Sequence, residues 1–137
     1  MILESTQHAC VYSLLDGNIH SFVFLQNTEQ AVDEFFDTLE IVIRQSTAET
    51  LLMYVDISRL ATKLPSFSYT RTRLKRLFAI CPNRPPARAV IVHNYGIVIS
   101  SLQTFMKIIQ LKRESVYRFV AASDEHIAFD WLLQQTN

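Results

Sequence analysis

The strongest constraint on the fold is a strand–helix–strand pattern from Ala87 to Ala122. The run from Ala89 to Val92 is too short for a helix, and its uniform apolarity is typical of a parallel strand covered on both faces. A helix is predicted from Tyr95 to Lys112, where apolar residues recur every three or four positions, and a strand from Val116 to Ala121. The three segments predict one βαβ unit with a right-handed crossover.

Two antiparallel strands are predicted near the start of the chain, from Ala9 to Leu15 and from Ile19 to Gln26. Between them, Asp16-Gly17-Asn18 is a turn signal in which glycine can take a positive φ. A helix then follows the cap residue Asn27 and ends near Gln45 or Ser46. Its apolar stripe consists of Val32, Phe35, Phe36, Leu39, Val42 and Ile43.

Strands and helices then alternate along the chain. A third strand lies between Thr50 and Ser58, and a basic helix runs from about Ser68 to Ile80. The buried face of that helix consists of Leu74, Leu77 and Phe78. Ser123 caps a last helix. Its inner face consists of Ile127, Ala128, Trp131 and Leu132. The order ββαβαβαβα predicts a single α/β domain over residues 1–137, with a mostly parallel sheet and an N-terminal hairpin.

Composition places the chain among ordinary globular domains. Its 137 residues, 49% of them hydrophobic and 19% charged, can bury a core that needs neither a metal nor a disulfide. Cys10 and Cys81 form no CxxC pair, and no segment has the pattern of a signal peptide or a membrane span. The two glycines, Gly17 and Gly96, cannot build a dinucleotide or phosphate loop. We expect a cytoplasmic protein with no cofactor and no integral membrane insertion.

Charge is segregated along the chain, although the total is zero. Nine acidic residues and one basic residue precede Arg59, whereas twelve basic residues and one acidic residue lie between Arg59 and Ala122. Either a basic face binds an acidic partner, or an acidic helix and a basic helix neutralise each other. Because few aromatic residues accompany the cations, we expect no nucleic acid binding. The cations concerned are Arg71, Arg73, Lys75, Arg76, Arg84 and Arg88.

The overall layout and two segments carry a family resemblance. The closing segment from Phe119 to Leu133 contains an acid-capped helix that ends in Ala-x-x-Trp-Leu. Asp56-Ile57-Ser58 ends the predicted third strand. It is similar to the Asp-Leu-Ser that ends the third strand in the SpoIIAA-like, or STAS, domain family, and nearly the whole chain resembles that family in layout. The resemblance implies a right-handed βα superhelix and a regulatory binding module rather than an enzyme.

The same resemblance makes Ser66 and Ser68 candidate phospho-acceptors at the start of the helix after the third strand. The stretch around them departs from the family pattern, because no Asp precedes the serine and no Gly follows it. A phosphate is favourable at a helix N-terminus. Helix capping explains both serines equally well.

Polar residues are expected at the carboxyl edge of the sheet, where open α/β sheets bind ligands. They are Asp56, Ser58, His93, Asn94 and Ser123. A histidine, an aspartate and a serine could form a hydrolytic trio there, but the chain has no nucleophile elbow, and helix capping explains these residues as well. His8 and Cys10 share one strand face without two further ligands, so no metal site is predicted.

The central strands carry apolar residues on both of their alternating faces, as Leu52 and Met53 illustrate. If the resemblance holds, most helices gather on one face and leave the other apolar and under-covered. Such a patch marks an interface or a ligand groove. Its candidate members are Tyr12, Phe22, Phe24 and Tyr54. The alternative is a doubly wound arrangement in which helices cover both faces.

Three functions are compatible with these features. The first is a non-enzymatic, STAS-like regulatory module that binds an unidentified protein partner and self-associates as a homodimer. The second is a carrier of an apolar or lipid-like small molecule held against the sheet. The third is a weak hydrolase that uses the polar residues at the strand ends.

Overall fold

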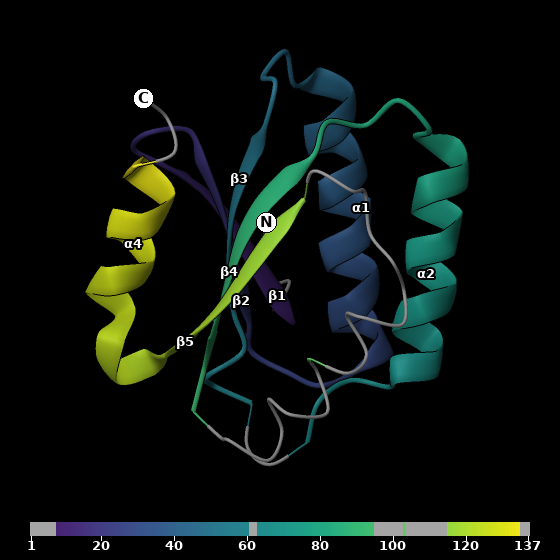
Figure 1. Cartoon of the computed structure of the whole chain (residues 1–137). Coiled ribbons are helices and arrows are strands. Elements are labelled where there is room, and N and C mark those ends of the chain that lie inside the picture. Colours follow the sequence, from purple (N-terminus) through teal and green to yellow (C-terminus); the bar gives the residue numbers. More distant parts are fainter. Residues whose placement is uncertain (1–7, 61–62, 95–102, 104–114, 135–137) are drawn as a thin grey trace, which may run out of the picture.

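The computed structural model describes residues 8–60, 63–94, 103 and 115–134. These ranges contain five strands and three helices (Figure 1). In chain order they are β1 (Cys10–Leu15), β2 (Ile19–Phe24), α1 (Glu29–Gln45), β3 (Leu51–Asp56), α2 (Phe67–Ile80), β4 (Ala87–His93), β5 (Val116–Ala121) and α4 (Glu125–Gln134). The helix predicted from Tyr95 to Lys112 falls, apart from Gln103, outside the described residues.

The five strands form one sheet in the order β1-β2-β3-β4-β5. β1 pairs with β2 in antiparallel orientation, and each later pair is parallel. Strands that follow one another along the chain are therefore neighbours in the sheet. The predicted α/β class, with a mostly parallel sheet and an N-terminal hairpin, is confirmed.

The turn between β1 and β2 requires left-handed backbone at two residues. Gly17 has a φ of 78° and Asn18 a φ of 61°, values that glycine and asparagine adopt most readily. A Cβ atom on Gly17 would lie 2.6 Å from Cδ2 of Leu133. The hairpin turn therefore lies against the end of α4.

Helices cover both faces of the sheet. Figure 1 shows α1 and α2 on one side of the strands and α4 on the other. Because side chains alternate along a strand, Phe22 and Met53 are buried among residues of α1 and α2, whereas Tyr54 and Val90 are buried beneath α4. We name these surfaces the α1 face and the α4 face. The expectation that one face of the central strands stays under-covered is wrong, because α4 covers it.

Thr28, rather than the predicted Asn27, caps α1. The Oγ1 atom of Thr28 accepts a 3.3 Å hydrogen bond from the N–H of Ala31. The side chain of Asn27 donates instead to the carbonyl of Lys63. Both residue types are favourable at an N-cap, so the sequence alone could not separate them. The helix ends at Gln45, as predicted.

α4 lies on the sheet mostly with the face predicted. Ala128 and Leu132 are fully buried, and Trp131 packs against the same cluster. Ile127, predicted to face inward, is 38% exposed, and Phe129, which is half-buried, stacks on Tyr54 with 4.6 Å between the ring centroids. Ser123 lies inside a 3-10 turn (Ala122–Asp124) that precedes the helix. The hydroxyl of Tyr54 also donates a 2.6 Å hydrogen bond to Oε2 of Glu125, which fixes the start of the helix on β3.

Glu34 of α1 fixes the start of β1. Its Oε1 atom accepts 2.8 Å hydrogen bonds from the backbone N–H groups of Ala9 and Cys10. The side-chain amide of Gln30 donates to its Oε2 atom at 2.9 Å. Partial burial by itself raises the pKa of Glu34, but these hydrogen bonds outweigh that effect and lower it.

Replacement of Glu34 by glutamine should make the free energy of unfolding less dependent on pH in the acidic range. A carboxylate whose pKa is lowered by folding stabilises the protein above its unfolded pKa, and this stability is lost as the pH falls through the folded pKa. We expect Glu34→Gln to lower the free energy of unfolding by about 1–2 kcal/mol at pH 7 and by less at about pH 3. Urea denaturation at both pH values measures the difference.

The matched control is Glu49→Gln, which changes an exposed glutamate and should alter stability by no more than about 0.5 kcal/mol at either pH. A loss for Glu34→Gln that is the same at both pH values would show that the charge of Glu34 does not stabilise the fold.

Candidate functional site

An apolar cavity of about 210 Å³ lies between the α1 face of the sheet, α1 and α2. Strands β3 and β4 and both helices line it with Leu51, Met53, Ala87, Ala89, Phe36, Leu39, Ile43, Leu74, Leu77 and Phe78. Among the described lining residues, polar side chains come from Thr70, Arg84, Ser115 and Tyr117. The site is therefore almost wholly apolar.

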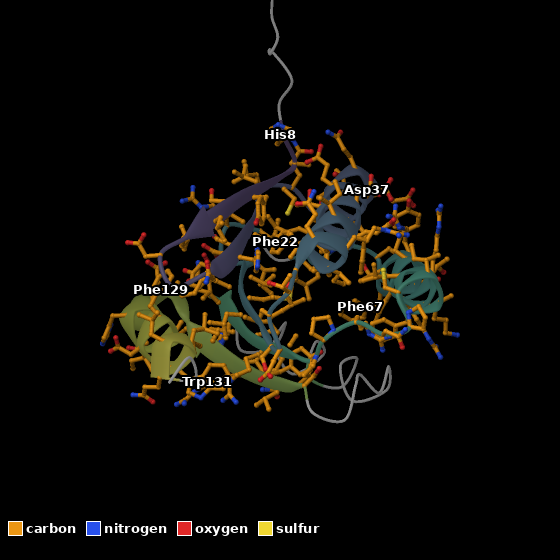
Figure 2. The ribbon with its side chains drawn as sticks, turned by 90° about the horizontal axis from the view of Figure 1, so that it is seen from above. His8, Phe22, Asp37, Phe67, Phe129 and Trp131 are labelled. Atoms are coloured by element: carbon orange, nitrogen blue, oxygen red, sulfur yellow. The ribbon has the colours of Figure 1, made fainter. Side chains whose placement is uncertain are left out.

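Among the described elements, α2 packs mainly against α1 rather than on the sheet. Leu77 is fully buried, but Leu74 and Phe78, which the sequence predicts to be buried, are half-buried and border the cavity. Figure 2 shows Phe67, the first residue of α2, on the side of the helix that faces the sheet. The apolar residues of α2 thus form the wall of a hollow instead of closing it.

An ionic cluster holds α2 to α1. Arg73 donates from Nη1 to Asp33 at 2.6 Å and from Nη2 to Asp37 at 2.8 Å. The hydroxyl of Tyr69 also donates to Asp33, at 2.6 Å. Burial by itself would lower the pKa of Arg73, but the two aspartates raise it. The acidic helix α1 and the basic helix α2 therefore neutralise each other within one chain at this point. Of the two explanations of the segregated charge, a basic binding face or mutual neutralisation of two helices, this contact supports the second.

Loss of this cluster should loosen α2. Because the Arg73 side chain is only 16% exposed, we expect Arg73→Met to lower the free energy of unfolding by about 1–3 kcal/mol, leaving Asp33 and Asp37 without their partner. Urea denaturation measures the change. The control is Lys75→Met, which alters an exposed cation on the same helix and should cost less than about 0.5 kcal/mol. Equal losses for the two variants would contradict a special role for Arg73.

Polar groups gather at one end of the cavity. The Cζ atom of Arg84 lies 3.6 Å from the ring centroid of Phe78, and Nη1 donates to the carbonyl of Cys81 at 3.2 Å. The Oγ atom of Ser115 accepts a 3.0 Å hydrogen bond from the N–H of Ala87. Burial raises the pKa of Tyr117, and the charge of Arg84 acts in the opposite direction. Arg84, Ser115 and Tyr117 therefore form a polar group in an otherwise apolar site.

The six cations that the sequence groups together do not share one surface. Arg73 is bound to α1, Arg84 lies over Phe78, and Arg88 lies over Trp131 on the α4 face. The other three are exposed on α2: Arg71, Lys75 and Arg76. Sequence reasoning missed the role of Arg84, because its position between Pro82 and Pro85 indicates a loop but no cavity.

The structure brings together three of the five residues predicted at the strand-end edge. Asp56 accepts hydrogen bonds from the N–H and the hydroxyl of Ser58, at 2.8 and 2.6 Å. The side chain of Asn94 donates to the carbonyl of Ser58 at 2.8 Å. These contacts close the turn after β3 and join it to the end of β4. The hydroxyl hydrogen of Ser58 is thus directed to Asp56.

His93 and Ser123 do not join this group. Val92 pairs with Asp56 across β3 and β4, so these two side chains lie on the same face of the sheet. Because side chains alternate along a strand, the side chain of His93 projects from the opposite face. Burial lowers the pKa of His93. Among the described residues, no hydrogen bond links His93 to Ser58 or Asp56, and Ser123 is exposed. The three residues of the proposed hydrolytic trio are therefore not assembled as a trio.

The four aromatic residues predicted to form one apolar interface lie on two faces. Phe22 and Phe24 are buried under α1, with Tyr12 packed against the same cluster. Tyr54 is buried on the α4 face, because its neighbour across β2 is Ser21 rather than Phe22. The prediction of a shared exposed patch is wrong, since three of these residues belong to the core and the fourth packs against it.

The remaining candidates have local structural roles. Ser66 caps α2, with its hydroxyl oxygen accepting from the N–H of Tyr69 at 3.2 Å, and both Ser66 and Ser68 are exposed. Their phosphorylation remains a prediction. Burial, and to a lesser extent Glu34, raises the pKa of Cys10 to about 12. Cys10 is therefore a buried thiol that keeps its proton at neutral pH.

Comparisons with models of protein families, with curated proteins and with solved structures found no match to this chain. Within the described ranges, no group of three or more His, Cys, Asp or Glu side chains could hold a metal ion. None of the helices in those ranges is long and apolar enough to cross a bilayer.

Proposed function

We propose that this protein is a non-enzymatic binding module that holds an apolar or lipid-like small molecule between α2 and the sheet. The observation that carries the proposal is the apolar cavity of about 210 Å³ on the α1 face. Ligand sites are typically apolar hollows with a few polar groups that orient the ligand. This cavity has both parts.

The size of the cavity supports the same proposal. Engineered apolar cavities of about 150 Å³ bind benzene, and the volume here is about 210 Å³.

The STAS resemblance and a cytoplasmic location belong to the same proposal. Consecutive strands β2 to β5 lie side by side in parallel, an order compatible with a right-handed βα superhelix. The cavity favours the small-molecule carrier over the protein-interaction module, and the separation of His93 from Ser58 favours both over the hydrolase.

A neutral fluorescent apolar dye, Nile red, tests the cavity directly. We expect the dye to bind with increased fluorescence and to raise the melting temperature. Ala89→Leu should weaken dye binding at least tenfold, because Ala89 lines the cavity and the larger side chain fills it. The control is Ala79→Leu on the exposed side of α2, which should bind the dye as the unchanged protein does.

Native mass spectrometry of freshly purified protein provides a second measurement that needs no substitution. We expect an additional mass that disappears on denaturation. If the native mass equals that of the polypeptide alone, and Nile red binds equally to Ala89→Leu and to the unchanged protein, the cavity is not a ligand site.

A second candidate function, self-association, is supported by the exposed edge of the sheet. β1 pairs only with β2 within the described sheet, and Leu14 and Val11 on it are 59% and 38% exposed. An edge strand of this kind can pair with the same strand of a second copy around a two-fold axis. The regulatory homodimer expected from the sequence would form in this way.

Light scattering coupled to size exclusion should show twice the mass of one chain. Leu14→Lys should shift the protein to a monomer, because a charged side chain on an edge strand opposes pairing. Leu25→Lys, at an exposed leucine just beyond β2, is the control and should remain dimeric. A monomer for the unchanged protein at concentrations of about 100 μM, well above the Kd of a stable dimer, would rule out this candidate.

A further inference from the structure

We infer that two copies of this chain join through their β1 strands in antiparallel orientation, with the two Ser13 residues opposite each other on the two-fold axis. The two five-stranded sheets then form one continuous sheet. This inference rests on the self-association proposed above as the second candidate function, and it specifies which residues of the edge strand meet. It does not depend on the cavity.

The hydrogen bonds between β1 and β2 determine which backbone groups of β1 face the open edge of the sheet. The N–H of Leu25 donates to the carbonyl of Ala9 at 2.8 Å. Successive residues of a strand direct their backbone groups alternately to one side and to the other, so Ala9 and the odd-numbered residues of β1 pair with β2. The backbone groups of Tyr12 and Leu14 therefore point away from β2, to a side on which the described sheet has no further strand.

A second β1 strand can satisfy these outward groups. The N–H of Cys10 also points outward, but it donates to the carboxylate of Glu34, so the outward donors left on the strand are those of Tyr12 and Leu14. In an antiparallel pair centred on Ser13, Tyr12 of each copy exchanges backbone hydrogen bonds with Leu14 of the other. The pattern is self-complementary, as a two-fold interface requires.

The two neighbouring registers match the edge less well. A pair centred on Tyr12 would place Leu14 of one copy opposite Cys10 of the other, whose N–H is already bonded within its own chain. A pair centred on Leu14 would place Tyr12 opposite Asp16, which lies in the hairpin turn beyond the end of β1. The backbone therefore favours the register centred on Ser13.

The side chains of β1 favour the same register. Leu14 and Val11 are 59% and 38% exposed, and the strand carries no charged residue that would repel a second copy. Leu14 of one copy would lie beside Tyr12 of the other on the α1 face. Val11 would lie beside Leu15 of the other on the α4 face. Each exposed apolar side chain of the strand thus gains an apolar neighbour across the two-fold axis.

Disulfide cross-linking tests the register. Opposed residues that exchange no hydrogen bonds have Cα atoms about 4.5 Å apart in an antiparallel pair, a separation that a disulfide can span. We therefore expect Ser13→Cys, under mild oxidation at about 100 μM protein, to form a covalent dimer at least about tenfold faster than Val11→Cys. The two Val11 positions would lie about 14 Å apart along the strands. Non-reducing gel electrophoresis measures both rates.

Val11→Cys is a matched control for random collisions, because both residues are exposed on the same face of the same strand. The unchanged protein, in which Cys10 and Cys81 are buried, should not cross-link. Reduced Ser13→Cys should have the same mass by light scattering as the unchanged protein. Addition of Leu14→Lys to Ser13→Cys should lower its rate to that of Val11→Cys, since the charge opposes pairing of the strands.

The outcomes separate this inference from the self-association on which it rests. If the unchanged protein is a monomer by light scattering, the self-association itself fails. If it is a dimer but Ser13→Cys cross-links no faster than Val11→Cys, the self-association stands and the register centred on Ser13 is wrong. Rapid cross-linking of Ser13→Cys that persists with Leu14→Lys would also overturn the proposed pairing of β1 with β1.

Discussion

The structure depends on the burial of apolar side chains from both faces of β3 and β4. Val90 and Val92 are fully buried against α4, while Ala89 and Ile91 belong to the core on the other face. A strand of this composition gains its hydrophobic stabilisation only if a second layer covers each side. The two helical layers are therefore both necessary. They are nevertheless built differently: α4 lies directly on the strands, whereas α2 is attached mainly through α1.

The local elements could be predicted because each depends on residues close together in sequence. Short apolar runs predict the central strands, and Asp16-Gly17-Asn18 predicts the hairpin turn in which Gly17 and Asn18 have positive φ angles. The errors arose where two elements meet. Tyr54 was grouped with Phe22, although the register of β2 with β3 places Ser21 opposite Tyr54. Register between parallel strands depends on how distant segments pack and cannot be derived from either strand alone.

The site was harder to predict for the same reason. The segregated charge is compatible with contact between an acidic and a basic helix or with a basic binding face, and which cation makes the contact depends on the rotation of α2 against α1. Arg73 is the residue that reaches both Asp33 and Asp37. The cavity has no sequence signature, since most of its described lining residues are ordinary apolar residues of the kind found in any core. Asp56 and Ser58 lie only two residues apart along the chain, so their contact is the easiest part of the edge to predict.

The α4 face of the sheet depends on a single described helix. Leu52 and Val90 are buried there by α4, so a chain without that helix would expose them to solvent. Exposed strand surfaces of this kind bind chaperones or aggregate. A chain truncated just after β5 would thus yield aggregation-prone material rather than a smaller folded domain.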